Sequence, residues 1–461
     1  MNTLALTLML LASFVCMGQD IPPKKLTLFT NVNVFDGTND KLHMNMNVLV
    51  ENNLIKTISK EGLMITASAN NTIIDGEGMT LMPGLVDNHT HFNMAQSGGI
   101  HAIENSRWDE IGAIAASAAQ EWLMDGFTTV RDMGGMGNGL KKTIDRGLLD
   151  GPRIYPSGSY VSQTSGHGDI IAGSFIDPQN SNYSRLNITQ LADGADEVRK
   201  AVRKNIAEGA TQIKIMVGGG ISSEKGPLFA PQFTNEEIKA AVAEAATRET
   251  YVGVHVYQAA HIKRALNLGV KSIEHGQFID REAAVLLKKK GAFLSPYFAA
   301  FSPAVMLHPV YGKKGTPQNT KMMEFIEQSK DFVDIIKEVQ PNVVFAIDIV
   351  NLNGVMARKQ RDHEKWIFAK KLGNFSALKA MTSTSGKLAQ LTGRTNPYPG
   401  KFGLIEAGAL ADILIVDGNP LKDISVIGGN EKFLDAPDRT RGIKSIKLIM
   451  KDGEIYKNTL K

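Results

Sequence analysis

The chain has 461 residues, of which 43% are hydrophobic and 21% are charged, as in a soluble globular protein that buries a large core. Its formal net charge is +4. It contains neither a basic block nor a basic stripe interleaved with aromatic residues, which argues against a nucleic-acid-binding protein.

Residues 1–18 form an uncharged apolar run that ends in small residues, with Cys16 and Gly18 placed as in a signal-peptide cleavage site. We predict that this segment is a signal peptide and that the protein is exported, to the periplasm or out of the cell. A membrane anchor is the weaker alternative, because the run is short for a span and no basic residue follows before Lys24. After cleavage the chain has no cysteine, so any metal ion must be bound by His and oxygen ligands.

Both ends of the mature chain are rich in short strands. Alternating apolar and polar residues, separated by turn residues, predict an antiparallel β unit in the N-terminal part, with strands at 26–29, 45–50, 54–58 and 72–74. The C-terminal part has similar runs at 411–416 and 443–450, followed by the turn 451–453. We therefore predict a small β-sandwich domain built from both termini, residues 19–80 and 396–461.

Residues 81–395 alternate apolar strand-like runs with helical stretches such as 195–208 and 235–250, the second with Thr234 as its N-cap. Repeated strand–helix units predict a parallel sheet, and eight of them fit a closed (β/α)8 TIM barrel. In that fold the chemistry is carried by residues at the C-terminal ends of the strands. The eight predicted strands are 81–91, 127–133, 153–163, 212–217, 251–257, 272–276, 292–298 and 343–349.

The first of these strands ends in two histidines, His89 and His91, with one residue between them. Side chains two apart on a strand point to the same side, so the two imidazoles would aim at one point, as a metal ion requires. The chain has only 10 histidines, which favours a ligand pair over a chance pair at the start of a loop.

Four more polar residues fall where later strands should end. Lys214 is either a lysine on a solvated edge or a buried amine converted by carbon dioxide to a carbamate that bridges two metal ions. His255 and His275 end consecutive strands, which favours metal ligands over satisfied core histidines. Asp348 closes an apolar run and suits a ligand and a helix cap equally well.

Taken in order, these six residues resemble the pattern of the amidohydrolase superfamily: H-x-H after strand 1, Lys after strand 4, His after strands 5 and 6, and Asp after strand 8. The segments 82–87 and 403–412 are similar to the family's motifs at the start of the barrel and at the return to the β domain. The resemblance implies two divalent ions, zinc, bridged by carbamylated Lys214 and a hydroxide. One ion would be completed by His89, His91 and Asp348, and the other by His255 and His275. Asp348 would be the catalytic acid and base.

The loop 162–169 and the pair His255-x-Tyr257 resemble a narrower branch, which contains prolidase-like dipeptidases, metal carboxypeptidases and ochratoxin-type amidases. This resemblance implies that His167 and Tyr257 grip a free carboxylate of the substrate. A loop-stabilising histidine is the alternative for His167. The sequence departs from the family beside Asp348, where Ile347 and Ile349 replace smaller residues.

The resemblance implies a binuclear metal-dependent hydrolase in which the bridging hydroxide attacks an amide or peptide bond next to a free carboxylate. A dipeptide such as Xaa-Pro or an N-acyl amino acid would be its small-molecule substrate. One alternative is a mononuclear cyclic-amide hydrolase similar to imidazolonepropionase, against which Lys214 argues. Another is a non-catalytic metal-binding protein, suggested by Ile347 and Ile349. After processing no membrane partner is expected, and a homo-oligomer is left open.

The remaining histidines, one long loop and one aromatic cluster are given structural roles or two alternative roles. The histidines at 43, 101, 261, 308 and 363 are assigned to the surface or to packing, with His363 at the start of a helix. The segment 164–186 is either a lid or a solvated loop. Tyr297, Phe298 and Phe301 form either an apolar substrate wall or part of the core.

Overall fold

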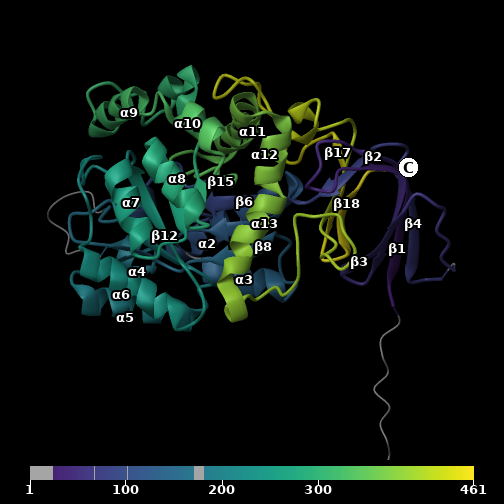
Figure 1. The fold of residues 1–461 in the computed structure, drawn as a ribbon, viewed down its shortest axis with the longest axis horizontal. Coiled ribbons are helices and arrows are strands. Elements are labelled where there is room, and N and C mark those ends of the chain that lie inside the picture. The colour runs from purple at the N-terminus through teal and green to yellow at the C-terminus, as the bar shows by residue number, and fades with distance from the viewer. Residues whose placement is uncertain (1–23, 67, 101, 136, 171–180, 461) are drawn as a thin grey trace, which may run out of the picture.

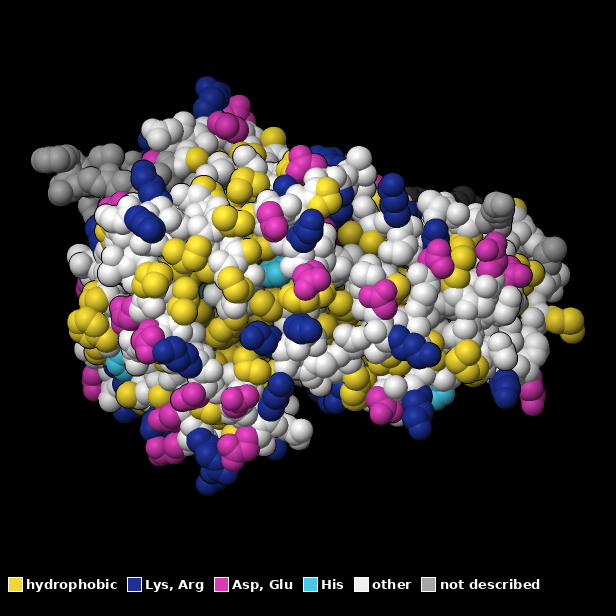
Figure 2. Space-filling view, turned by 90° about the horizontal axis from the view of Figure 1, so that it is seen from above, with side chains coloured by type: hydrophobic (Ala, Val, Ile, Leu, Met, Phe, Trp, Pro, Cys, Tyr) yellow, Lys and Arg dark blue, Asp and Glu magenta, His cyan; other side chains and the backbone are white. Residues whose placement is uncertain are grey.

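The computed structural model describes residues 24–66, 68–100, 102–135, 137–170 and 181–460. The predicted signal peptide and the predicted packing role of His101 lie outside the described residues, and so does the middle of the 164–186 segment. Figure 1 shows a helix-rich part beside a part made mainly of strands from the two ends of the chain. In the view from above (Figure 2), Lys and Arg are interspersed with Asp and Glu over both parts. Among the described helices, none has the length and apolarity needed to span a bilayer.

An eight-stranded sheet combines strands from both ends of the chain in the order β18-β17-β16-β5-β1-β2-β3, with β4 beside β1. The pairing of β5 with β16 joins the two ends. The predicted antiparallel pairing of the N-terminal strands is confirmed for β1, β2 and β3. It is wrong for the strand predicted at 72–74, because β4 returns to β1 by a crossover and runs parallel to it, as β5 does. The strands are β1 (Leu26–Val34), β2 (His43–Glu51), β3 (Leu54–Ser59), β4 (Asn71–Asp75), β5 (Thr80–Pro83), β16 (Ile413–Val416), β17 (Ile446–Lys451) and β18 (Glu454–Asn458).

The helix-rich part has an α/β fold with parallel sheets, as predicted. One sheet has three strands, β6 (Leu85–Thr90), β7 (Phe127–Asp132) and β8 (Arg153–Pro156). The other has seven strands in the order β10-β9-β11-β12-β13-β14-β15. These are β9 (Tyr160–Ser162), β10 (Thr189–Leu191), β11 (Ile213–Met216), β12 (Val252–Gln258), β13 (Ser272–Phe278), β14 (Phe293–Ser295) and β15 (Asn342–Val343).

Backbone hydrogen bonds also connect the edges of these two sheets. At one edge, the amide of Asn88 donates to the carbonyl of Phe345 at 2.9 Å, and the amide of Asp348 donates to the carbonyl of His89 at 2.8 Å. Elsewhere, the amide of Thr211, just before β11, donates to the carbonyl of Pro156 of β8 at 2.7 Å. The first two bonds bring the segment after β15 next to β6.

Several predicted strands are shorter or divided in the structure. The strand predicted at 81–91 is divided into β5, in the eight-stranded sheet, and β6, and the strand predicted at 292–298 is regular only over β14. The strand predicted at 343–349 is regular only over β15, because the chain beyond it bonds to several different neighbours and the φ of 50° at Asp348 turns the backbone. The strand predicted at 153–163 is divided into β8 and β9 around Gly158, whose φ is 70°.

Helices surround the parallel strands (Figure 1). The helix predicted at 195–208 is confirmed, and it ends at Gly209 in the left-handed conformation typical of a C-cap. The predicted N-cap Thr234 is also confirmed, since its side chain accepts from the amide of Glu237 and the Glu237 carboxylate accepts from the amide of Thr234. The α-helices are α1 (Ala102–Asn105), α2 (Trp108–Met124), α3 (Gly137–Asp145), α4 (Asn182–Arg185), α5 (Ala195–Glu208), α6 (Asn235–Ala246), α7 (Ala259–Asn267), α8 (Arg281–Lys289), α9 (Pro317–Gln328), α10 (Phe332–Val339), α11 (Gly354–Leu372), α12 (Asn374–Met381) and α13 (Ser383–Ala389).

Short 3-10 helices complete the described chain: η2 (Ala299–Phe301), η3 (Pro303–Leu307), η4 (Gln390–Thr395) and η5 (Ile424–Ile427). The largest hydrophobic core packs strand residues such as Ile215 and Val254 against helix residues such as Ile238. His363 lies within α11 and is buried, so its predicted position at the start of a helix is wrong.

Arg153 of β8 joins the parallel strands to the eight-stranded sheet. Its guanidinium is 1% exposed and donates to the Thr129 hydroxyl at 2.9 Å and to the Asp412 carboxylate at 2.5 Å, and it also pairs with Asp452. A buried carboxylate that loses its cation keeps its desolvation penalty without compensation. The position of the strand-rich part next to β8 therefore depends on this arginine.

We expect Arg153→Met to lower the free energy of unfolding by about 3–5 kcal/mol, because it leaves the carboxylate of Asp412 buried and unpaired. Urea denaturation followed by circular dichroism would measure the change. Arg281→Met is the matched control, because it removes an exposed ion pair with Glu338 and should cost about 1 kcal/mol or less. Equal losses in the two variants would contradict this role of Arg153.

Candidate metal centre

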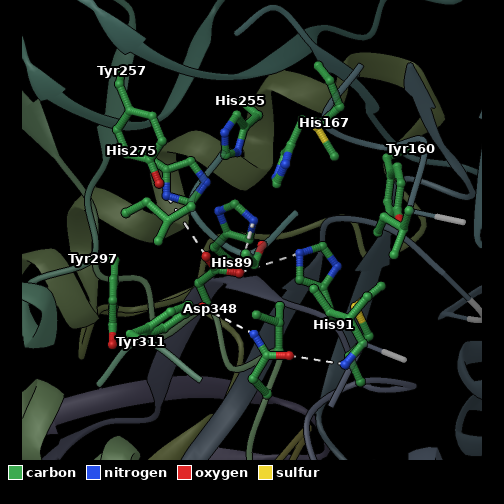
Figure 3. A pocket seen from close by; sticks show the side chains of 18 of the residues that line it. His89, His91, Tyr160, His167, His255, Tyr257, His275, Tyr297, Tyr311 and Asp348 are labelled. Atoms are coloured by element: carbon green, nitrogen blue, oxygen red, sulfur yellow. Dashed lines mark hydrogen bonds and ion pairs between the residues drawn. The ribbon is translucent and has the colours of Figure 1, made fainter. Parts of the chain in front are cut away.

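All eight residues predicted for the site line one pocket, whose volume is about 740 Å³ including its open mouth (Figure 3). They come from strands far apart in the sequence, which meet because parallel strands end at a common edge. His89 belongs to β6 and His91 follows it. The other residues lie on β11, β12 and β13, after β9 and after β15: Lys214, His255, Tyr257, His275, His167 and Asp348.

Three of the predicted ligands form a compact group. Nε2 of His91 lies 3.5 Å from Oδ1 of Asp348, and Nε2 of His89 lies 3.7 Å from the same oxygen. One ligand atom from each of the three residues lies within 4.8 Å of the others, so a single ion could be held between them. Nδ1 of His275 is 3.9 Å from Oδ2 of Asp348, on the other side of the carboxylate.

Lys214 is buried in this cluster. Its side chain is 1% exposed, and Nζ is 3.2 Å from Nε2 of His89. Burial lowers the pKa of Lys214 to about 8, although the nearby carboxylates of Glu274 and Asp348 oppose the shift. The alternative of a lysine on a solvated edge is therefore wrong.

The imidazoles of the site are in the state that binds metal ions. Burial lowers the pKa of His91 to about 3 and moves the pKa of His89, His255 and His275 well below the usual range. They are therefore neutral at neutral pH, and a neutral imidazole has the free lone pair that a ligand needs.

The second nitrogen of each of three histidines faces an oxygen behind the site. Nδ1 of His91 is 3.0 Å from the carbonyl of Gly134, and Nε2 of His255 is 3.1 Å from the carbonyl of Gly219. Nδ1 of His89 is 3.1 Å from the Glu274 carboxylate, too poorly aligned for a hydrogen bond but close enough for an electrostatic contact. Metal-binding histidines characteristically donate their other N–H to such oxygens, so the donor set fits a metal ion.

Glu274 was missed by the sequence analysis. Its carboxylate is fully buried and accepts from Arg131 at 2.7 and 2.8 Å and from the Ser272 hydroxyl at 2.6 Å. Arg131 also donates to the carbonyl of Asn88 at 2.7 Å. The sequence did contain a signal, namely an acidic residue directly before a predicted ligand in an apolar strand, and an arginine at the end of β7. Together they form a charged layer behind His89.

The backbone around Asp348 is strained but well supported. Asp348 and His275 have φ values of 50° and 72°, a conformation that costs energy for residues other than glycine and is found at functional sites. The side chain of Gln360 donates to the carbonyl of Ile347 at 3.1 Å and fixes the turn.

Burial raises the pKa of Asp348 to about 6, and the nearby positive charge of Lys214 partly opposes this shift.

The two isoleucines that bracket Asp348 do not obstruct the pocket. Ile347 and Ile349 are fully buried in the hydrophobic core, while Asp348 between them lines the pocket. The unusual pair therefore faces the core, and only Asp348 between them faces the pocket.

His167 and Tyr257 lie beside the candidate ligands (Figure 3). The His167 ring is 4.2 Å from that of His255, and the Tyr257 ring is 5.2 Å from those of His255 and His275. Nδ1 of His167 is 2.7 Å from the hydroxyl of Ser223, and burial lowers the pKa of His167 to about 3. Their proposed contact with substrate stays a prediction.

Some pocket residues were assigned elsewhere from the sequence. His308 was placed at the surface or in packing, but it lines the pocket and stacks on Tyr311 at 4.2 Å. Of the predicted aromatic wall, Tyr297 lines the pocket, whereas Phe298 packs in the core against Phe368. These side chains depend on loop folding, which strand periodicity does not describe.

Comparisons with known proteins agree with this geometry. A profile of the amidohydrolase family matches residues 80–456. Ochratoxinase of Aspergillus niger is 33% identical over 365 residues, 75% of this chain and 72% of that protein. A solved structure described as an amidohydrolase has a TM-score of 0.82 and 32% identity over 95% of this chain and 100% of its own. A prolidase complexed with N-methylphosphonate-L-proline has a TM-score of 0.82 and 30% identity over 94% of this chain and 100% of its own. The predicted branch is confirmed.

We expect Glu274→Gln to weaken metal binding about 10–100-fold, because the charge that orients His89 is lost while the side-chain shape is kept. Competition with a chelating dye would measure the affinity. The matched control is Glu364→Gln, at a second buried glutamate whose carboxylate accepts from the amides of Phe298 and Ala299. Unchanged affinity in Glu274→Gln would remove Glu274 from the metal centre.

Proposed function

Because the chain belongs to the amidohydrolase family and is a metal-dependent hydrolase of amide bonds, we propose that its substrates carry a free carboxylate next to the scissile bond. A dipeptide such as Xaa-Pro and an N-acyl amino acid both satisfy this description. The convergence of two predicted carboxylate-binding residues, His167 and Tyr257, on the predicted ligands in one pocket carries the proposal.

In this proposal two divalent ions occupy the pocket. His89, His91 and Asp348 would hold one, and His255 and His275 the other. The Nζ amine of Lys214 would add to carbon dioxide and lose a proton, giving a carbamate that reaches both. Zinc suits a donor set of imidazoles and carboxylates. The bound ions would lower the pKa of a water to about 7 and polarise the scissile carbonyl.

Asp348 is the proposed proton carrier. Its carboxylate faces the pocket, and its backbone amide is fixed by the carbonyl of His89. It would accept a proton from the attacking water as the new C–O bond forms, and deliver it to the nitrogen of the leaving amine as the C–N bond of the resulting tetrahedral intermediate breaks. A carboxylate that faces both the attacking water and the leaving nitrogen can perform both transfers.

The remaining walls of the pocket would position the two halves of the substrate. His167 and Tyr257 would bind the carboxylate on the amine side. On the side of His91, Met94, Ile100 and Met216 form an apolar surface next to Tyr160, and they would pack against the acyl side. The buried hydroxyl of Tyr160 has no hydrogen-bond partner among the described residues, so it is available to a polar atom of the acyl group.

The same proposal extends to the architecture and the location of the protein. We propose that the two parallel sheets close into one (β/α)8 barrel over residues 81–395, supported by the hydrogen bonds of Asn88 and Thr211 between the sheets. Residues 19–80 and 396–461 would form the small β domain, supported by the sheet that combines both ends. The segment 1–18 would direct export.

A mononuclear hydrolase of cyclic amides remains the second candidate, favoured by one observation. His89, His91 and Asp348 form a three-ligand group that could hold a single ion without Lys214. The number of ions per chain therefore distinguishes the two candidates.

We expect two metal ions per chain in the unaltered protein, at most one in Lys214→Met, and a fall in kcat/KM of at least about a hundredfold in that variant. Elemental analysis and amide hydrolysis would measure these quantities, and labelled bicarbonate would report the carbamate by NMR. The control Lys365→Met replaces another buried lysine, whose Nζ donates to the carbonyl of Ile427. One ion per chain and undiminished activity in Lys214→Met would favour the mononuclear candidate.

We expect Tyr257→Phe to raise KM about 10–100-fold for an N-acyl amino acid, because a hydrogen bond to a charged group is lost. KM for the same compound with its carboxylate converted to a primary amide should change little. Steady-state kinetics with both compounds measure the difference. Tyr456→Phe on β18 is the control. Equal effects on both compounds would show that Tyr257 does not recognise the carboxylate.

A further inference from the structure

The loop that follows β11 is folded around the ammonium group of Lys321, a residue of α9. Nζ of Lys321 donates to the carbonyls of Ser223 at 2.8 Å, Gly226 at 2.9 Å, Gly220 at 3.1 Å and Lys225 at 3.2 Å. The lysine is 8% exposed. A residue about a hundred positions away thus supplies one cation to four carbonyls of a single loop.

Four carbonyl oxygens that converge on one point need a positive charge between them. Each carbonyl has a partial negative charge, and buried carbonyls without a donor carry a desolvation penalty. An ammonium provides three N–H donors and a full positive charge, so it can satisfy all four oxygens through shared hydrogen bonds. Without Lys321 the oxygens would repel one another, and we expect the loop to open.

This loop supports several parts of the candidate site. The carbonyl of Gly219 accepts from Nε2 of His255, and the hydroxyl of Ser223 contacts Nδ1 of His167. The α-carbon of Gly220 packs directly against the His167 imidazole, since a Cβ there would lie 2.1 Å from Cε1. Ile221 and Ser222 line the pocket.

The hydrogen bonds of Ser223 connect the lysine to His167. The Ser223 hydroxyl lies 2.8 Å from the carbonyl of Lys225, an oxygen that Lys321 also binds. Because Lys321 satisfies this carbonyl, the hydroxyl is free to donate to Nδ1 of His167, which leaves the Nε2–H of the neutral ring to donate to a carboxylate. Because His167 is held between this hydroxyl, Gly220 and the ring of His255, its orientation follows from the fold of the loop.

We propose that Lys321 is a positioning residue for recognition of the substrate carboxylate, acting as an internal cation that shapes the loop 218–226 and thereby fixes His167. This inference rests on the proposed function. The helix α9 contributes none of the predicted site residues. According to the proposal, it nevertheless affects the affinity for substrate through Lys321.

Kinetics of the metal-loaded enzyme give the first test. We expect Lys321→Met to raise KM for an N-acyl amino acid about tenfold or more, with a smaller change in kcat and little change in KM for the carboxylate-free amide. Lys330→Met, just beyond α9, removes an exposed lysine and should behave as the unaltered enzyme. Equal kinetics in the two variants, or equal losses with both substrates, would overturn the proposal.

Chemical rescue tests the cation directly. Lys321→Ala lacks three carbons and the ammonium, which together match n-propylammonium, while 1-propanol has the same carbon chain without the charge. We expect amide hydrogen exchange in 218–226 to increase in Lys321→Ala and to return towards the original rate with n-propylammonium only. Rescue by both compounds, or by neither, would overturn the proposal. This readout needs no substrate, so it decides whether the Lys321 cation shapes the loop 218–226 even if the unaltered enzyme proves not to prefer carboxylated amides.

If the Lys321 variants do not fold, Ser223→Ala supplies the test, because it leaves the Lys321 contacts with the backbone in place and removes the hydroxyl that contacts His167. We expect the same selective rise in KM for the carboxylated substrate. An unchanged KM would contradict the proposed connection from the loop to His167.

Discussion

A buried ion pair between Arg131 and Glu274 is the interaction on which the candidate site depends. Arg131 donates to the carbonyl of Asn88 on β6 and to the hydroxyls of Tyr251 and Ser272 next to β12 and on β13, in addition to the Glu274 carboxylate. The guanidinium of Arg131, which belongs to β7, therefore connects this strand with β6, β12 and β13 at the level of the candidate site. Because an unpaired charge there would be very costly, this arrangement leaves little freedom to His89 and His275, which flank it.

The chemistry of the pocket follows from this water-poor setting. Burial keeps the imidazoles neutral, the form that binds metal ions. It also lowers the pKa of Lys214 to about 8, which raises the fraction of the uncharged amine that reacts with carbon dioxide. The surrounding oxygens of Gly134, Gly219 and Glu274 orient the rings from behind. The scaffold and the predicted ligands are thus parts of one hydrogen-bonded system, and the loop held by Lys321 extends it to His167.

Much of this arrangement could be predicted from the sequence, because it depends on local patterns. A strand presents alternate residues to one side, so His89 and His91 could be paired, and residues at the ends of parallel strands meet, so Lys214, His255 and His275 could be added. The Thr234 cap and the helix at 195–208 also follow from local rules. The structure brings all of these predicted site residues into one pocket.

The parts that were missed depend on contacts between distant segments. Glu274 and Arg131 can be understood only as a pair, since each alone resembles an ordinary charged residue. The turn at Asp348 is imposed by the carbonyl of His89, and the approach of His308 depends on the fold of a loop. The contacts of Lys321 with four carbonyls could not be predicted from side-chain patterns, because every residue of every sequence has a backbone carbonyl.

The most direct measurement of the central claim is an anomalous difference map from crystals of the zinc-loaded protein at the zinc absorption edge. We predict two peaks on either side of the Lys214 side chain, one at about 2.0–2.2 Å from ligand atoms of His89, His91 and Asp348 and one at a similar distance from His255 and His275. A single peak, or peaks away from Lys214, would contradict a binuclear centre built on this lysine.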